Sequence, residues 1–167
     1  MKNALRVITD MHEDWARRFG EGHRFAPLVE EYQLDDAEYA IMTLGSMTGA
    51  AKDAIDEARA AGEKVGLIKI KTFSPFPVEA LQHALRGVRA LGVVDRSVNF
   101  RWNCGPMFQE TLGVLYRLGR QVPAQSFIGG LAGADLTVTT FRRVIDETRA
   151  LLTRAPSDEP VWLNAKD

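Results

Sequence analysis

Cysteine is nearly absent from this chain of 167 residues, which contains Cys104 alone. One thiol cannot close an internal disulfide, and it cannot supply the ligands of an iron–sulfur cluster or a structural zinc ion. We therefore expect no disulfide framework and no metal bound by this chain alone. Sparse cysteine is also typical of the reducing cytoplasm, where we expect the protein to be located.

An excess of charge of one sign is also lacking, because 21 Lys and Arg residues balance 22 Asp and Glu residues. The net charge of −1 gives no electrostatic basis for binding nucleic acid or an anionic membrane. No apolar run approaches bilayer length, and Asp10, Glu13 and Arg17 interrupt the N-terminal segment. The sequence predicts no nucleic-acid partner, no membrane partner and no signal-peptide core.

The usual fingerprints of nucleotide and metal sites are missing as well. Residues 45–49 precede a predicted helix, but they lack the spacing of a dinucleotide-binding loop and the lysine of a P-loop. His12, His23 and His83 have no second ligand at the spacing that metal sites use. We therefore expect no catalytic, cofactor-binding or metal-binding residues within this chain.

Short apolar runs alternate with amphipathic stretches along most of the sequence. The apolar runs predict strands over 39–44, 65–70, 90–94 and 124–128. Helical spacing predicts helices over 2–19, 47–61, 78–86, 106–118 and from 138 to about 152, with Ser46 and Thr137 as N-caps. This order indicates an α/β fold of three layers, in which a mostly parallel sheet has helices on both faces.

The chain is long enough for one hydrophobic core and is expected to form one structural domain. We divide it into an N-terminal helix and connecting loop over 1–36, an α/β domain over 37–153 and a tail over 154–167. Residues 21–36 look irregular because glycine, proline and acidic residues interrupt them. In the tail, Trp162 and Leu163 are the residues expected to dock on a surface.

Ligands of such sheets usually bind beyond the carboxyl ends of the strands. The loops at these ends hold the candidate site or interface positions, which are Ser74, Pro75, Phe76, Asp95, Arg96, Gly130, Gly133 and Asp135. A structural explanation competes with ligand binding in each loop. Residues 45–49 suit a capped turn, and residues 129–135 suit a tight loop against which another layer packs. Asp95 and Arg96 fit either a functional acid with its charge partner or a salt bridge that fixes a loop.

Cys104 offers a further hypothesis because it precedes Gly105 and Pro106 at the start of a predicted helix. A helix N-terminus lowers the pKa of a nearby thiol and makes it more reactive. The competing interpretation is an inert thiol in a loop, which is the commoner case for a single cysteine.

Four segments, read in order, resemble the C-terminal domain of the α chain of pyruvate:ferredoxin and related 2-oxoacid:ferredoxin oxidoreductases. They are LVEEYQLDDAEYAIMTLGSMTGAAKDAIDEARAAGEKVGLIKIKTFSPFP (28–77), LGVVDRS (91–97), GPMFQE (105–110) and FIGGLAGAD (127–135). The resemblance covers most of the chain and implies a fold similar to the C-terminal domain of transketolase. The chain departs from the family pattern at Ser74, at 101–104 and at Ala132 and Ala134.

The resemblance implies oxidative decarboxylation of a 2-oxoacid such as pyruvate to an acyl-CoA, with electrons passed to ferredoxin. It places thiamine diphosphate and the iron–sulfur clusters on partner domains or subunits, with none bound by this chain. The chain would then be a non-catalytic part that supports subunit assembly and meets ferredoxin only indirectly. Two alternatives remain, namely a stand-alone anion- or nucleotide-binding module that uses the strand-end loops, and a small enzyme that uses Cys104.

Overall fold

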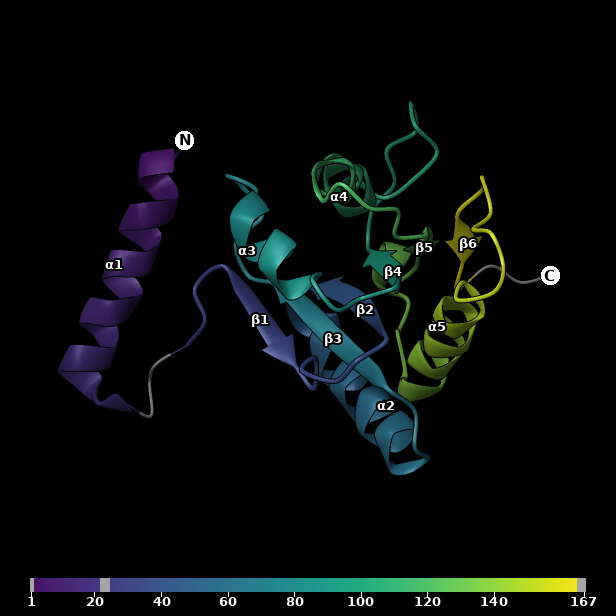
Figure 1. Cartoon of the computed structure of the whole chain (residues 1–167), viewed down its shortest axis with the longest axis horizontal. Coiled ribbons are helices and arrows are strands. Elements are labelled where there is room, and N and C mark those ends of the chain that lie inside the picture. The colour runs from purple at the N-terminus through teal and green to yellow at the C-terminus, as the bar shows by residue number, and fades with distance from the viewer. Residues whose placement is uncertain (1, 22–24, 165–167) are drawn as a thin grey trace.

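A six-stranded sheet organises the computed structural model, which describes residues 2–21 and 25–164 (Figure 1). The strand order is β1-β3-β2-β4-β5-β6; β1 pairs with β3 antiparallel, and all other neighbours pair parallel. The strands are β1 (Val29–Tyr32), β2 (Tyr39–Leu44), β3 (Val65–Ile70), β4 (Ala90–Asp95), β5 (Ala124–Ile128) and β6 (Val161–Trp162). The predicted α/β architecture with a mostly parallel sheet is confirmed.

Helices cover both faces of this sheet. On one face lie α2 (Thr48–Ala60) and α5 (Val138–Ala150), which contact each other and share one apolar core with the sheet. On the other face lie α3 (Val78–Ala84) and α4 (Pro106–Arg117), which share a second core. Fully buried alanines at 51, 54 and 58 let α2 lie close to the strands. The three predicted layers are therefore present.

The helix boundaries follow local signals in the sequence. Pro106 occupies the first turn of α4, where its missing N–H costs no hydrogen bond. Thr137 caps α5, and its hydroxyl accepts a hydrogen bond from the Thr140 N–H at 3.2 Å. The predicted cap at Ser46 is wrong, because a 3₁₀ turn η2 (Gly45–Met47) precedes α2, whose first turn receives no side-chain cap.

The two edge strands were not predicted. β1 lies within residues 21–36, which we expected to be irregular, and β6 lies within the tail. Both escape the pattern because an edge strand needs few apolar residues: β1 reads VEEY, and β6 has two residues. Thus the sheet extends beyond both limits of the 37–153 segment, while the division of the chain into three parts stays a prediction.

The N-terminal helix α1 (Lys2–Phe19) agrees with the predicted helix over 2–19. It lies at the periphery of the molecule, where Leu5 and Thr9 line a shallow hollow together with Pro77 and Ala80 at the start of α3 (Figure 1). The exposed rings of Trp15 and Phe19 lie 4.2 Å apart between centroids. This helix therefore lies beside the start of α3 and not over a face of the sheet.

Candidate functional site

The carboxyl ends of β2 and β4 meet where the direction of the chain across the sheet reverses. β2 leads through α2 to β3 on one side, and β4 leads through α4 to β5 on the other. Such a switch point leaves a crevice between the strand ends, where open α/β sheets bind ligands. A hollow of about 190 Å³ lies here, lined by Ser46, Met47, Ala50, Arg96, Ala134, Asp135 and Leu136.

Asp95 does not face this hollow but fixes the start of α4. Its carboxylate accepts hydrogen bonds from the backbone N–H groups of Met107 at 2.9 Å and Phe108 at 3.1 Å. Burial raises the pKa of Asp95 to about 6, although the two N–H groups oppose the shift. A Cβ on Gly105 would lie 1.9 Å from an Asp95 oxygen, so only glycine fits there. Asp95 is therefore a structural acceptor at a helix N-terminus.

Arg96 turns the other way, to the loop that follows β5. Its guanidinium donates to the Gly130 carbonyl oxygen at 3.2 Å. Within the described residues, no ion pair joins Arg96 to Asp95, so the salt bridge suggested for this dipeptide is wrong. Burial of Asp95 and exposure of Arg96 keep the two charges apart.

The loop after β5 includes a 3₁₀ turn, η3 (Leu131–Gly133), and the tail holds it in place. Asn164 accepts from the Gly130 N–H at 2.6 Å and donates to the Asp135 carbonyl oxygen at 3.1 Å. Gly130 has a φ of 73°, and a Cβ there would approach the Arg96 side chain to 2.8 Å. The role of Asn164 was not predicted, because nothing in the pattern of the tail marks this residue. This loop is a packed junction between β5 and the tail, as its glycines suggested.

Three further predicted positions lie elsewhere at the same edge. Ser74 and Pro75 form a cis peptide after β3, and Phe76 packs edge-to-face on Phe73 with ring centroids 5.8 Å apart. Phe76 also packs against the core beneath α3 and α4. None of these residues lines the hollow beside Arg96. The structure therefore brings together Arg96, Gly130 and Asp135, while Ser74, Pro75 and Phe76 form a separate turn.

Cys104 is a buried thiol, with 8% of its surface exposed. Burial and, to a smaller extent, the nearby Asp95 carboxylate raise its pKa above the ordinary value. The hypothesis of a thiol activated by the helix N-terminus requires a lowered pKa and is therefore wrong. The helix N-terminus already has a partner in Asp95, which destabilises a second negative charge at the thiol.

A larger hollow, which the sequence did not indicate, lies between α4 and the tail. We call it the α4 groove. It has a volume of about 410 Å³ and is lined by Trp102, Asn103, Cys104, Phe108, Gln109, Leu112, Gln125, Ser126, Ser157, Asp158, Glu159 and Pro160. The one available signal was the presence of two aromatic residues, Phe100 and Trp102, in the loop that follows β4. No lining residue is basic, so the groove does not suit an anionic ligand.

The described residues do not fit a metal centre or an iron–sulfur cluster. Across residues 2–21 and 25–164, no group of three or more His, Cys, Asp or Glu side chains lies close enough to hold a metal ion. With Cys104 as its single cysteine, the chain does not offer the ligands of an iron–sulfur cluster. No helix of the described part is long and apolar enough to cross a membrane.

A family assignment follows from comparison with known proteins. Residues 37–141 match the family model described as the pyruvate:ferredoxin oxidoreductase core domain II. The chain belongs to this family. The chain is 73% identical over its full length to the α subunit of the NADH-dependent phenylglyoxylate dehydrogenase of Aromatoleum evansii. It is 33% identical over its full length to the pyruvate synthase subunit PorA of Methanosarcina barkeri. The chain spans 40% and 41% of the length of these two curated relatives.

Two solved structures share the fold of this core domain II. A 2-oxoglutarate:ferredoxin oxidoreductase from Magnetococcus marinus aligns with a TM-score of 0.55 and 21% identity, over 74% of this chain and 20% of that chain. A split-gene transketolase aligns with a TM-score of 0.60 and 18% identity, over 78% of this chain and 44% of that chain. At these identities the likeness concerns the fold alone, and it confirms the predicted transketolase-like architecture.

Proposed function

We propose that this chain is the core domain II part of an α subunit of a thiamine-dependent 2-oxoacid oxidoreductase whose substrate is an aromatic 2-oxoacid of the phenylglyoxylate type. The observation that carries the proposal is the 73% identity, over the whole chain, to a phenylglyoxylate dehydrogenase α subunit. The identity to the pyruvate synthase subunit is 33%, which favours the aromatic substrate over pyruvate.

The whole enzyme would release CO₂ from the 2-oxoacid, transfer the acyl group to coenzyme A and pass two electrons to an acceptor. This chain would support that reaction in the cytoplasm by packing against the parts that bind thiamine diphosphate and iron–sulfur clusters. Two features support a structural role: the described residues lack the ligands for a cluster, and Asp95 is engaged in holding α4. The relative's name favours NAD as the acceptor, whereas the family name favours ferredoxin.

Co-expression tests this proposal. The tagged chain is produced together with the reading frames that neighbour its gene, and the captured proteins are identified. We expect a complex that oxidises phenylglyoxylate in the presence of coenzyme A faster than it oxidises pyruvate, with NAD and ferredoxin tested in parallel. Turnover by the purified 167-residue chain alone would contradict the structural role, and a preference for pyruvate would contradict the substrate class.

The hollow beside Arg96 supports the alternative of a stand-alone anion-binding module, because it lies at the switch point of the sheet. Its volume of about 190 Å³ is below the range of about 300–1,000 Å³ that small-molecule sites occupy, and Asp135 places a negative charge in its wall. We therefore favour the subunit. Inorganic pyrophosphate that raises the melting temperature of the native chain, but not that of an Arg96→Ala variant, would reverse this preference.

A further inference from the structure

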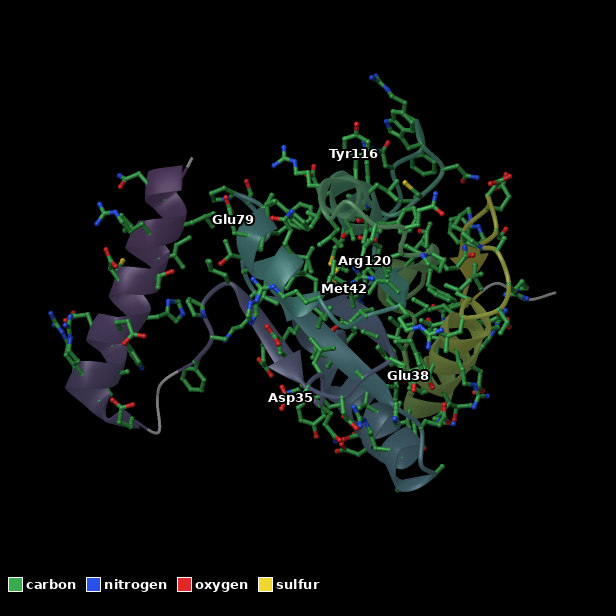
Figure 2. All side chains as sticks on the ribbon, in the orientation of Figure 1. Asp35, Glu38, Met42, Glu79, Tyr116 and Arg120 are labelled. Carbon is green, nitrogen blue, oxygen red and sulfur yellow. The ribbon has the colours of Figure 1, made fainter. Side chains whose placement is uncertain are left out.

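Exposed aromatic side chains gather around the α4 groove. Phe100 is 89% exposed, Trp102 65% and Tyr116 90%, and Leu112 on α4 is 46% exposed. Figure 2 labels Tyr116 on the outer side of α4, away from the sheet. Several large, solvent-exposed aromatic side chains close together are typical of an interaction surface, where Trp and Tyr contribute most of the binding energy.

The groove continues along α4 as a longer channel of mixed apolar and polar lining. A second hollow of about 600 Å³ shares Leu112 with it and adds Tyr116, Val122 and Pro156 to the lining. The channel walls are α4 on one side and residues 155–160 of the tail on the other. In the α4 groove, a protruding side chain of a partner would meet Phe108 and Leu112 of α4 and Pro160 of the tail, beside the polar Gln125 and Ser126 of β5.

A rigid protrusion stands at one end of the channel. Asn99 and Cys104 form an isolated β-bridge, and the Asn99 N–H donates to the Cys104 carbonyl oxygen at 2.8 Å. The Asn99 side chain accepts from the Arg101 N–H at 3.1 Å and donates to Gln109 of α4 at 2.6 Å. These bonds hold residues 100–102 at the tip of a small hairpin, which we call the aromatic tip. An ordered tip loses little conformational entropy when it binds.

Unpaired charges of opposite sign flank the channel. The Arg101 guanidinium in the aromatic tip has no hydrogen bond or ion pair with any described residue, and neither has the Asp158 carboxylate. Asp158 lines the groove on the wall opposite α4, whereas Trp102 lines it next to Arg101. The same face thus carries a cationic aromatic protrusion and a hollow with an acidic wall.

Such a face is complementary to itself. In a two-fold symmetric pair, the same face of both copies forms the interface. The protrusion of each copy can then insert into the hollow of the other copy. The aromatic tip of each copy would enter the α4 groove of the other, and Arg101 would approach Asp158 across the interface. A small anionic molecule would gain no ion pair from the groove lining, which contains no basic side chain.

We propose that the occupant of the α4 groove is a second copy of this chain, bound by exchange of the aromatic tips about a two-fold axis. The proposal goes beyond the function proposed above and is independent of it, because it concerns the chain alone and requires no substrate, cofactor or other subunit.

Sedimentation velocity of the purified 167-residue chain, from about 1 µM to about 1 mM, measures the pairing directly. We expect a monomer–dimer equilibrium within this range. Trp102→Ala should weaken it by about thirtyfold or more, as the loss of a buried aromatic anchor does. A native chain that is monomeric at every concentration, as it would be if the groove served a different subunit, overturns the proposal.

Charge reversal distinguishes this pairing from a non-specific one. Arg101→Glu should weaken the dimer about tenfold or more, and the double variant Arg101→Glu/Asp158→Arg should return to the native dissociation constant. Arg143→Glu makes the same charge change on α5, on the opposite face of the sheet, and should leave the dimer unchanged. Equal effects of Arg101→Glu and Arg143→Glu, or no recovery in the double variant, overturn the proposal. All these positions are exposed, and circular dichroism verifies that each variant is folded.

Discussion

The two faces of the sheet differ in how completely this chain covers them. On the α2–α5 face, the helices contact each other, and Ile55, Phe127 and Phe141 are fully buried. On the α3–α4 face, the α4 groove stays open, and Phe100 and Tyr116 are almost fully exposed. The α2–α5 face therefore buries its aromatic side chains within the described residues, whereas the α3–α4 face leaves apolar surface exposed.

Truncating one aromatic residue on each face tests this contrast most strongly. Phe141→Ala removes a fully buried ring of the α2–α5 face, which we call the closed face, and should lower the free energy of unfolding by about 3–5 kcal/mol. Tyr116→Ala removes an exposed ring of the α3–α4 face, which we call the open face, and should change the free energy of unfolding by no more than about 0.5 kcal/mol. Urea unfolding at low protein concentration measures both values, and equal losses would contradict the contrast.

The start of α4 supplies the next largest effect. Gly105→Ala would place a Cβ 1.9 Å from the Asp95 carboxylate and should destabilise the fold by about 3 kcal/mol. Gly113→Ala is the matched control in the same helix: no atom lies within 4 Å of a Cβ there, and it should stabilise by about 0.5–1 kcal/mol. Thermal unfolding compares the two variants. A stable Gly105→Ala protein would show that Asp95 is free to move.

The raised pKa of Asp95, at the start of α4, makes the free energy of unfolding depend on pH. Because burial raises this pKa from 3.8 to about 6, the folded chain holds a proton that the unfolded chain has lost. The contribution to stability is therefore complete below about pH 4 and disappears as the pH rises to about 6, with a total of up to about 3 kcal/mol.

Urea unfolding of the native chain and of Asp95→Asn at several pH values between 4 and 7 isolates this contribution. The difference in the free energy of unfolding between the native chain and the variant should decrease as the pH rises. The pKa of Glu30 is lowered by Lys52, and that of Glu63 is lowered, despite partial burial, by hydrogen bonds from Tyr39 and Arg142; both groups act in the opposite direction but equally in both proteins. A difference that stays constant across this range would contradict the raised pKa.

The smallest effect concerns the cap of α5 on the closed face. Thr137→Ala removes the hydroxyl that accepts from the Thr140 N–H and should cost about 1 kcal/mol. Thr137→Ser retains the hydroxyl and should cost less. Thermal unfolding measures both, and equal losses from the two variants would indicate that the methyl group of Thr137, rather than its cap, stabilises the helix.

Strong local patterns made the inner part of the fold predictable. Buried strands such as β2 and β3 are continuous apolar runs, and the Thr137 cap follows from residue type and position. β1 was not predictable, because Glu30 is accommodated by Lys52 of α2 and Lys69 of β3, which are distant in the sequence, while Glu31 is exposed. The family resemblance was carried by motif order and is confirmed by the match over 37–141.

The candidate site was less predictable because it depends on pairs of residues far apart in the sequence. Adjacent Asp95 and Arg96 suggested a local ion pair, yet the pleat of the strand and the close approach of α4 send the two side chains to different partners. The α4 groove arises only when residues 157–160 return to lie beside α4. No local sequence pattern encodes this long-range contact, so the strand-end loops could be predicted as candidate sites but the α4 groove could not.

The brevity of the edge strands limits how this domain can grow into larger structures. β1 offers four residues of backbone with two carboxylates, and β6 offers two residues. A foreign strand that added to either margin would gain few hydrogen bonds and would meet the charges of β1. Neighbouring molecules must therefore be recognised through side chains, and continuous fibres built by strand addition are disfavoured.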